Sequence, residues 1–209
     1  RTNMGATRRS AAQHSQSLHA IVAHIPGLKV AMPSSALEAK GLLKTAIRDN
    51  NPVVIFEDKL MYQDKAEVPE GEFLIPFGVA NVKREGSDIT LVGTSSMVQV
   101  AEKAAEILAV EGISAEVIDP RTIVPLDMDT INTSVRKTSR CIVIDEGHQS
   151  FGITSEIASR IMEQSFYHLQ YPTVPNRVKR PTHFATNRDA FDNPPFHKFL
   201  IRGLLHNRL

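Results

Sequence analysis

The sequence predicts an α/β fold built on a mostly parallel sheet. In the second half of the chain, a strand pattern followed by a helix pattern occurs three times in succession with short connections. Parallel neighbours need crossover connections, and these crossovers cover the faces of the sheet. In the first half, a strand, a capped helix and a second strand form a further connected α/β piece. Both halves therefore indicate the same fold class.

The first half begins with a polar stretch. Residues 1–17 show no periodicity, which predicts a loop. A short helix is predicted over His19–Ala23, and Pro26 and Gly27 end it. Leu28–Met32 follows as a short strand.

A longer helix is predicted to begin at Ser35. Ser35 and Glu38 form a capping box, in which the serine accepts from an exposed amide and the glutamate reaches back. Its apolar face is formed by Leu37, Leu42, Leu43 and Ile47. Asp49–Asn51 ends the helix before a proline, and the β-branched run Val53–Phe56 is typical of a strand covered on both faces.

The polar stretch after Tyr62 predicts a boundary. It contains Pro69, Gly71 and Pro76 and has no period of 2 or 3.6 residues. We therefore expect a first unit over residues 1–62, a linker over 63–76 and a second unit over 77–209.

The second unit alternates between strands and helices. The predicted strands are Ile89–Val92, Ala115–Ile118 and Cys141–Ile144, and the predicted helices are Val98–Val110, Asp127–Val135 with an acidic cap, and Phe151–Met162. Ligands of parallel sheets gather at the carboxyl ends of the strands, here Gly93–Ser96, Asp119–Arg121 and Asp145–His148. Tyr171–Pro195 predicts no dependable element, and Phe196–Leu205 predicts a short amphipathic helix.

Composition excludes several classes of function. With 24 basic and 23 acidic residues the net charge is +1, so no overall field favours nucleic acid. No apolar run approaches the roughly 20 residues of a membrane span, and we expect a soluble, cytoplasmic protein. The single cysteine, Cys141, lies in the run CIVI, which favours a buried strand thiol over a nucleophile.

The common catalytic fingerprints are absent from the sequence. It contains no GxxxxGK[ST], GxGxxG, GxSxG, HExxH or CxxC motif. Nucleotide hydrolysis, Rossmann dinucleotide binding, serine hydrolysis and zinc chemistry therefore lose their strongest support.

Three groups of residues are candidates for chemistry. His14, in AAQHSQS, has amide and hydroxyl neighbours that can orient its ring for proton transfer, but spacing alone favours a solvated loop histidine. Asp49, Asn50 and Asn51 can place oxygens around a hard cation, although a plain helix stop explains the same residues. Asp119 and Arg121 form either an ion pair at a strand end or a structural corner.

Three long segments together resemble a known family. They are AAQHSQSLHAIVAHIPGLKV, AKGLLKTAIRDNNPVVIFEDKLMY and EVIDPRTIVPLDMDTI, in that order. Over roughly Ala11–Phe166 the chain resembles the β subunit of the thiamine-diphosphate-dependent first component of 2-oxo acid dehydrogenase complexes. IFEDKLMY, EVPEGEFLIP and VKREGSDITL look closer to the acetoin and pyruvate types than to the branched-chain type.

The resemblance implies a division of the chain and of the coenzyme site. Residues 1–62 match the latter part of a pyrimidine-binding domain, and residues 77–209 match a transketolase C-terminal domain. The coenzyme would lie between this chain and an α subunit that holds the diphosphate and Mg²⁺, and the sequence contains no GDG motif of its own. The implied assembly is an α2β2 heterotetramer that serves a lipoyl acyltransferase core, in the mitochondrial matrix if the source is eukaryotic.

The resemblance also assigns roles to residues. His14 matches a catalytic histidine of the coenzyme channel that is implicated in acyl transfer to the lipoyl arm. Ala46, Asp49 and Asn51 match a potassium site. The glutamate that activates the coenzyme has no match, so no cofactor-binding residue is assigned, and we expect the chain to be N-terminally incomplete and inactive alone.

The implied reaction is oxidative decarboxylation of pyruvate, or cleavage of acetoin, on thiamine diphosphate with acyl transfer to lipoyl groups. Two alternatives remain at this stage. One is another enzyme of the transketolase superfamily, and the other is a non-catalytic assembly module.

Overall fold

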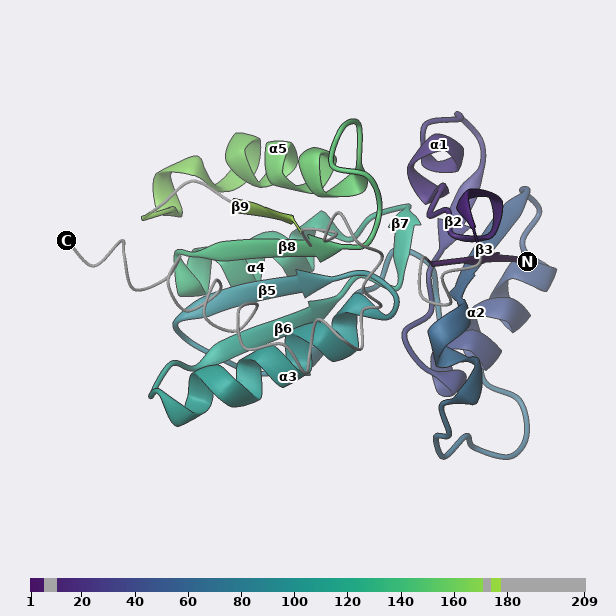
Figure 1. Cartoon of the computed structure of the whole chain (residues 1–209), viewed down its shortest axis with the longest axis horizontal. Helices are drawn as coiled ribbons and strands as arrows, with labels where there is room; N and C mark the ends of the chain where they lie inside the picture. Colours follow the sequence, from purple (N-terminus) through teal and green to yellow (C-terminus); the bar gives the residue numbers. More distant parts are fainter. Residues whose placement is uncertain (6–10, 171–173, 178–209) are drawn as a thin grey trace.

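The computed structural model describes residues 1–5, 11–170 and 174–177. It contains two sheets that lie side by side, each with helices packed on it (Figure 1). The first sheet has the strand order β1-β3-β2-β7, with β1 (Thr2–Met4), β2 (Lys29–Ala31) and β3 (Val53–Asp58) parallel and β7 (Thr122–Val124) antiparallel to β2. The fold class that the sequence predicts, α/β with mostly parallel sheets, is confirmed.

The second sheet has the order β4-β6-β5-β8-β9. Its strands are β4 (Asn81–Arg84), β5 (Ile89–Gly93), β6 (Ala115–Asp119), β8 (Cys141–Asp145) and β9 (Val174–Arg177). Only β4 is antiparallel to its neighbour; the other pairs are parallel. The parallel order places the carboxyl ends of β5, β6 and β8 at one edge.

Five α-helices and three short 3-10 turns complete the described residues. They are α1 (His19–Ala23), α2 (Ala36–Arg48), α3 (Met97–Val110), α4 (Met128–Thr138), α5 (Ile153–Ser165), η1 (Ala12–His14), η2 (Lys59–Gln63) and η3 (Phe166–His168). Each strand and helix predicted within residues 19–165 is confirmed, most of them with ends that differ by one to three residues. The acidic cap is also confirmed, since Asp127 accepts from the Thr130 amide at 3.0 Å.

Several expectations were wrong in detail. The predicted loop over residues 1–17 contains β1 and η1, and Tyr171–Pro195 contains β9. With three or four residues each, these elements are too short to show a periodic pattern in the sequence. Strand β1 is defined by its pairing with β3, and strand β9 by its pairing with β8. Helix α5 begins at Ile153 because Phe151 has a φ of 57° and Gly152 is extended. The helix predicted over Phe196–Leu205 lies outside the described residues.

The capping box of α2 differs from the predicted one. Ser35 Oγ accepts from the Glu38 amide at 3.3 Å, as expected. The Glu38 carboxylate, however, accepts from the Ser34 amide at 3.0 Å and not from that of Ser35. The Glu38 carboxylate takes this position near Ser34 because it is buried and also pairs with Arg121 of the second unit.

The two units share one hydrophobic core. Met4, Val30 and Phe56 of the first unit pack in the same cluster as Val92 and Ile118 of the second. Strand β7 adds to this contact because it follows β6 in the chain yet pairs with β2, and it forms the edge of the first sheet that faces the second (Figure 1). Burial of this shared cluster favours one arrangement of the units.

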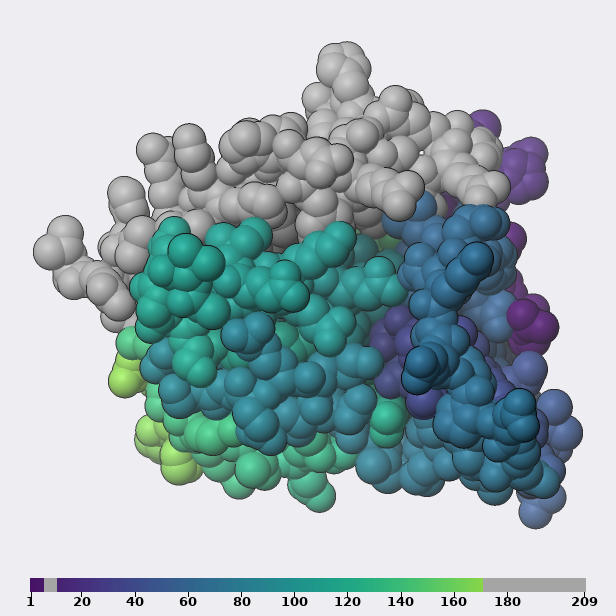
Figure 2. Space-filling view, turned by 90° about the horizontal axis from the view of Figure 1, so that it is seen from below, coloured from purple at the N-terminus to yellow at the C-terminus, as the bar shows by residue number. Residues whose placement is uncertain are grey.

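The linker segment lies on α2. Most of residues 63–76 are exposed, and Figure 2 shows their blue surface on the first-unit side of the molecule. Ile75 is the buried residue of this segment, and it packs against Gly41, where an added Cβ would lie 2.6 Å from Ile75 Cγ1. Thr45 Oγ1 also donates to the Ile75 carbonyl at 2.7 Å. A glycine in α2 thus permits the close approach of the linker.

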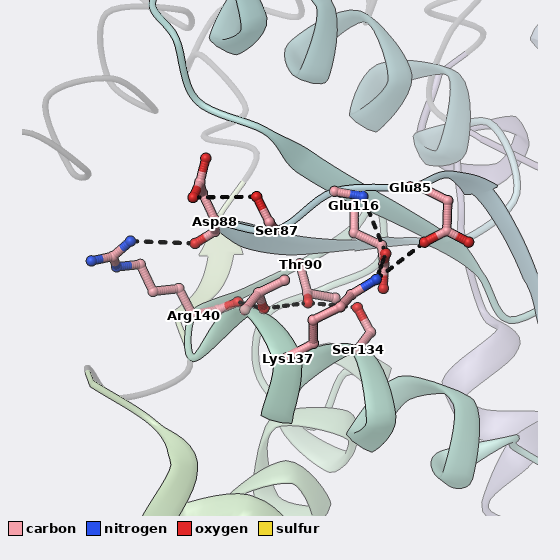
Figure 3. Close-up of polar contacts among 10 residues, drawn as sticks. Glu85, Ser87, Asp88, Thr90, Glu116, Ser134, Lys137 and Arg140 are labelled. Carbon is pink, nitrogen blue, oxygen red and sulfur yellow. Dashed lines mark hydrogen bonds and ion pairs between the residues drawn. The ribbon is translucent and has the colours of Figure 1, made fainter.

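Polar contacts fasten α4 to the second sheet. Lys137 reaches from α4 to Glu85 and to the buried carboxylate of Glu116 (Figure 3). Thr90 Oγ1 lies 2.7 Å from the hydroxyls of both Ser134 and Thr138. Because these buried groups satisfy one another, α4 packs without unpaired hydroxyls at this face.

Cys141 is buried in β8, as predicted, and burial raises the pKa of its thiol to about 12. A thiol in that state is inert as a nucleophile at neutral pH. Among the helices of the described residues, none has both the length and the apolar character to cross a membrane.

Candidate functional site

The carboxyl ends of β5, β6 and β8 face the first unit. This is the edge at which the sequence predicts ligands, and side chains of the first unit lie against it. The side-chain contacts across it include those of Ser17 with Glu146, His19 with Asp145, Ser34 with Asp119, and Asp58 with Ser96. All eight of these side chains belong to buried residues. At these positions the edge is therefore an interface between the two units.

His14 lies in the segment that precedes this interface. It ends η1, its side chain is exposed, and Gln13 Nε2 lies 3.2 Å from its Nε2 atom. The segment is tied at several points: the Gly5 amide donates to the Gln16 carbonyl at 3.1 Å, and Lys59 donates to the His14 carbonyl. An exposed imidazole on a tethered segment can exchange protons with a bound partner. Its catalytic role stays a prediction.

His19 and Asp145 form a buried pair that the sequence did not reveal. His19 Nε2 lies 3.0 Å from Asp145 Oδ2, and Asp145 also accepts from Thr94 and from the Gly147 amide. Burial alone would lower the pKa of His19, but the charge and hydrogen bond of Asp145 outweigh burial and raise it. Burial likewise opposes ionisation of Asp145, yet its contacts with His19 and its hydrogen bonds lower its pKa.

Within the described residues, the other ring nitrogen of His19, Nδ1, is buried without a hydrogen-bond partner. The only hint in the sequence is that Asp145 stands at a predicted carboxyl end. His19 reads as the first residue of a short helix, and 126 positions separate the two. A local pattern cannot connect residues so far apart.

The three residues predicted for potassium lie together at the end of α2. The Asp49 amide donates to the Ala46 carbonyl at 3.3 Å, and Asp49 Oδ1 accepts from the amide and side chain of Asn51 at 2.8 and 2.9 Å. Asp49 Oδ2 accepts from Lys29 at 2.5 Å, and this contact is the main cause that lowers the pKa of Asp49 to about 2. The carbonyl and carboxylate oxygens are of the type a hard cation prefers.

Lys29 already supplies one positive charge to Asp49, so a cation here would share this carboxylate with an ammonium group. The potassium site stays a prediction. No group of three or more histidine, cysteine, aspartate or glutamate side chains in the described part of the chain is arranged to hold a metal ion.

Asp119 and Arg121 do not pair through their side chains, so the ion pair that the sequence allowed as one of two alternatives is not formed. Arg121 Nε donates to Glu38 Oε1 at 3.2 Å, and only the Arg121 backbone amide donates to Asp119, at 2.8 Å. The φ of 60° at Arg121 turns its side chain away from Asp119 and toward α2. The structural corner that the sequence also allowed is what forms.

Comparisons with known proteins agree with this architecture. Residues 1–65 match the family model of the transketolase pyrimidine binding domain, and residues 78–188 match that of the transketolase C-terminal domain. In fold, the chain is similar to a solved structure described as "Split gene transketolase, inactive beta4 tetramer". The TM-score is 0.68 at 25% identity, over 79% of this chain and 53% of that one.

Similar curated proteins are β subunits of two enzymes. The chain is 49% identical over 172 residues to the β subunit of the acetoin:2,6-dichlorophenolindophenol oxidoreductase of Bacillus subtilis, covering 82% of this chain and 50% of that protein. It is 50% identical over 172 residues to the mitochondrial pyruvate dehydrogenase E1 component subunit beta-2 of Oryza sativa subsp. japonica, covering 80% and 46%.

The chain thus spans about half the length of these curated relatives. A third relative, pyruvate dehydrogenase E1 component subunit beta of Rickettsia felis, is 45% identical over 191 residues, or 91% of this chain and 59% of that protein. The chain therefore belongs to the transketolase family, with a pyrimidine-binding segment followed by a C-terminal domain, and it is similar to the β subunits of pyruvate dehydrogenases and acetoin oxidoreductases.

Proposed function

We propose that this chain is the part of a 2-oxo acid dehydrogenase β subunit that supplies one wall of a thiamine diphosphate site. The whole enzyme would decarboxylate pyruvate, or cleave acetoin, and transfer the acyl group to lipoyl groups. The observation that carries this proposal is the 49–50% identity to β subunits of both enzyme types over about 80% of the chain. An α subunit in an α2β2 assembly and a lipoyl acyltransferase core are the proposed partners.

The described residues fit a shared site better than a self-contained one. His14 is exposed, so a partner surface is needed to exclude water from it. When bound, thiamine diphosphate supplies a stabilised carbanion. The proposed part of this chain is to hold His14 at that site, where its imidazole donates a proton to the sulfur that leaves when the lipoyl disulfide opens. The proposed α subunit holds the diphosphate with Mg²⁺.

The remaining expectations belong to the same proposal. Residues 1–62 and 77–209 act as two domains joined by 63–76, and Ala46, Asp49 and Asn51 hold potassium. We expect the protein in the cytoplasm if the source is a bacterium and in the mitochondrial matrix if the source is a eukaryote. An upstream segment would supply the carboxylate that activates the coenzyme, so the chain alone is expected to be inactive.

A split transketolase is the second candidate function, and the similarity in fold to such a protein favours it. Coexpression with candidate α subunits separates the two. The proposal predicts that the purified pair binds thiamine diphosphate, and that with the upstream segment restored it releases CO₂ from pyruvate or cleaves acetoin. Transfer of two-carbon units between sugar phosphates, or a pair that binds no coenzyme, would overturn it.

A further inference from the structure

Two carboxyl pairs span the interface between the units. Glu38 of α2 faces Asp119 at the end of β6, and Asp58 at the end of β3 faces Glu146 after β8. All four residues are less than 9% exposed. Two ionised carboxylates in contact in such a place would repel strongly, because the interior screens charge poorly. The total negative charge of each pair must therefore be less than that of two ionised carboxylates.

At the first pair, a count of hydrogens shows where one proton lies. Ser34 Oγ is 2.6 Å from Glu38 Oε2 and also 2.6 Å from Asp119 Oδ2. A hydroxyl has one hydrogen to donate, so the second short contact needs a hydrogen from a carboxyl group. Arg121 donates to Glu38 at 3.2 Å and so stabilises its ionised form. The proton therefore lies on Asp119.

Electrostatics agree with this assignment. Burial, and then the charge of Glu38, raise the pKa of Asp119 well above its ordinary value. Burial opposes ionisation of Glu38 too, but its hydrogen bonds with Asp119 and Ser34 outweigh burial and lower its pKa. Lys83 is the other charged group that acts on Glu38. The two carboxyls thus titrate as one unit.

The second pair lies where the end of β3 meets the end of β8. A Cβ built on Gly5 would lie 2.7 Å from Asp58 Oδ1 and 3.1 Å from Glu146 Oε1, so both carboxyls converge on one point. Ser17 Oγ donates to Glu146 Oε1 at 2.7 Å. Asp58 accepts from Ser96 and, at 2.8 Å, from the Leu60 amide. These donors favour the ionised form of Asp58, although burial outweighs them and raises its pKa.

Glu146 is the member that carries the proton. Burial first, and then the charge of Asp58, raise the pKa of Glu146 to about 8. The charged groups around the pair are Lys59, which favours ionised Asp58, and the His19–Asp145 pair. His19 favours ionised Glu146 and Asp145 opposes it, so these two neighbours act in opposite directions.

We propose that each pair holds one proton between the two units, and that loss of these protons with rising pH weakens the interface. A carboxyl that is protonated in the folded chain and ionised in the unfolded chain takes up a proton on folding. Stability then falls as the pH rises from the ordinary carboxyl range toward the raised value in the fold. For Glu146 that window runs from 4.5 to about 8.

The weakening reaches the proposed catalytic segment. Ser17, three positions after His14, donates to Glu146 across the interface. When Glu146 and Asp58 are both ionised, their repulsion separates the groups to which this segment is tied. The pairs act on the folded chain itself, so their test needs neither coenzyme nor partner, and failure of the proposed function would leave the result intact.

The test is urea unfolding of the chain at pH 5.5, 6.5 and 7.5 at constant ionic strength. Each shared proton raises the unfolding constant by about tenfold per pH unit in this window. Asp119→Asn and Glu146→Gln keep a hydrogen donor at every pH, so each should remove about one factor of ten per pH unit. Asp127→Asn is the control and should keep the wild-type slope, because Asp127 caps α4 within one unit and its hydrogen bonds lower its pKa despite burial.

A wild-type chain whose unfolding constant does not rise with pH, or a double variant with the wild-type slope, overturns the proposal. A second measurement on the wild-type chain covers variants that fail to fold. The infrared carbonyl band of protonated carboxyl groups should be present in the folded chain at pH 7 and lost by pH 9.5. Its absence at pH 7 would also overturn the proposal.

Discussion

At the scale of single residues, histidines of one short segment have opposite surroundings. His14 is exposed, whereas His19, five positions later, is fully buried against Asp145. The exposed one was found from its polar neighbours and from the family resemblance. The buried one was missed because its partner belongs to the other unit. A short-range pattern identifies a candidate for chemistry, but it does not identify a histidine whose partner lies in the other unit.

Replacing His19 tests how much the buried His19–Asp145 pair contributes to stability. His19→Ala would leave the Asp145 carboxylate buried without its main counter-charge, and we expect a loss of about 3–5 kcal/mol in the free energy of unfolding at pH 6. Because partnering raises the pKa of His19, the part of this loss due to its charge should shrink as the pH rises past that pKa. Urea unfolding at pH 6 and 8.5 measures both effects.

The matched control is His24→Ala, since His24 ends the same short helix but is exposed. A change within about 0.5 kcal/mol is expected there. Equal losses in the two variants would mean that the buried His19–Asp145 pair contributes no stability.

At the scale of elements, the end of α2 brings together the residues predicted for potassium. The helix stop that the sequence predicts at Asp49–Asn51 is formed, and Asp49 then accepts from both Asn51 and Lys29. Lys29 lies on β2, which pairs with β3 directly after this stop. A cation here would therefore stabilise the joint between α2 and the first sheet.

Exchange of potassium for choline at equal ionic strength tests the site. We expect potassium to add about 1–3 kcal/mol to the free energy of unfolding at saturation, because it binds only the folded chain. Asp49→Asn should remove most of this difference, while Asp129→Asn, at an exposed position of α4, should keep it. Identical thermal midpoints of the wild-type chain in the two salts would count against a potassium site.

Some strands and helices can be predicted from a periodic sequence pattern, and others cannot. Strands and helices with a buried face, such as β5, α3 and β8, repeat apolar residues often enough to be predicted within one or two residues at their ends. Strands β4 and β7 carry no such repeat, because they are short and lie at the edges of their sheets. Their place is decided by pairing with β6 and β2, which no local pattern contains.

At the scale of the whole molecule, the two units meet at the carboxyl edge of the second sheet. The sequence predicted this edge correctly, and it predicted ligands there. The structure brings Ser34, His19 and Asp58 of the first unit against it. The prediction from sequence could not include these contacts, since they depend on how one unit docks on the other. The shared core around Val30 and Ile118 and the shared protons follow from that docking.

We propose that this chain brings a catalytic histidine, His14, to a site completed by a partner. The most direct measurement is the single-turnover rate of lipoyl acylation by an α and β pair whose β subunit contains this sequence. His14→Gln should lower this rate by about 10²–10⁴-fold and leave thiamine diphosphate binding unchanged, since general acid catalysis contributes about that much. His24→Gln, at another exposed histidine of the same region, should match the wild type. Equal acylation rates for His14→Gln and the wild type would contradict the claim.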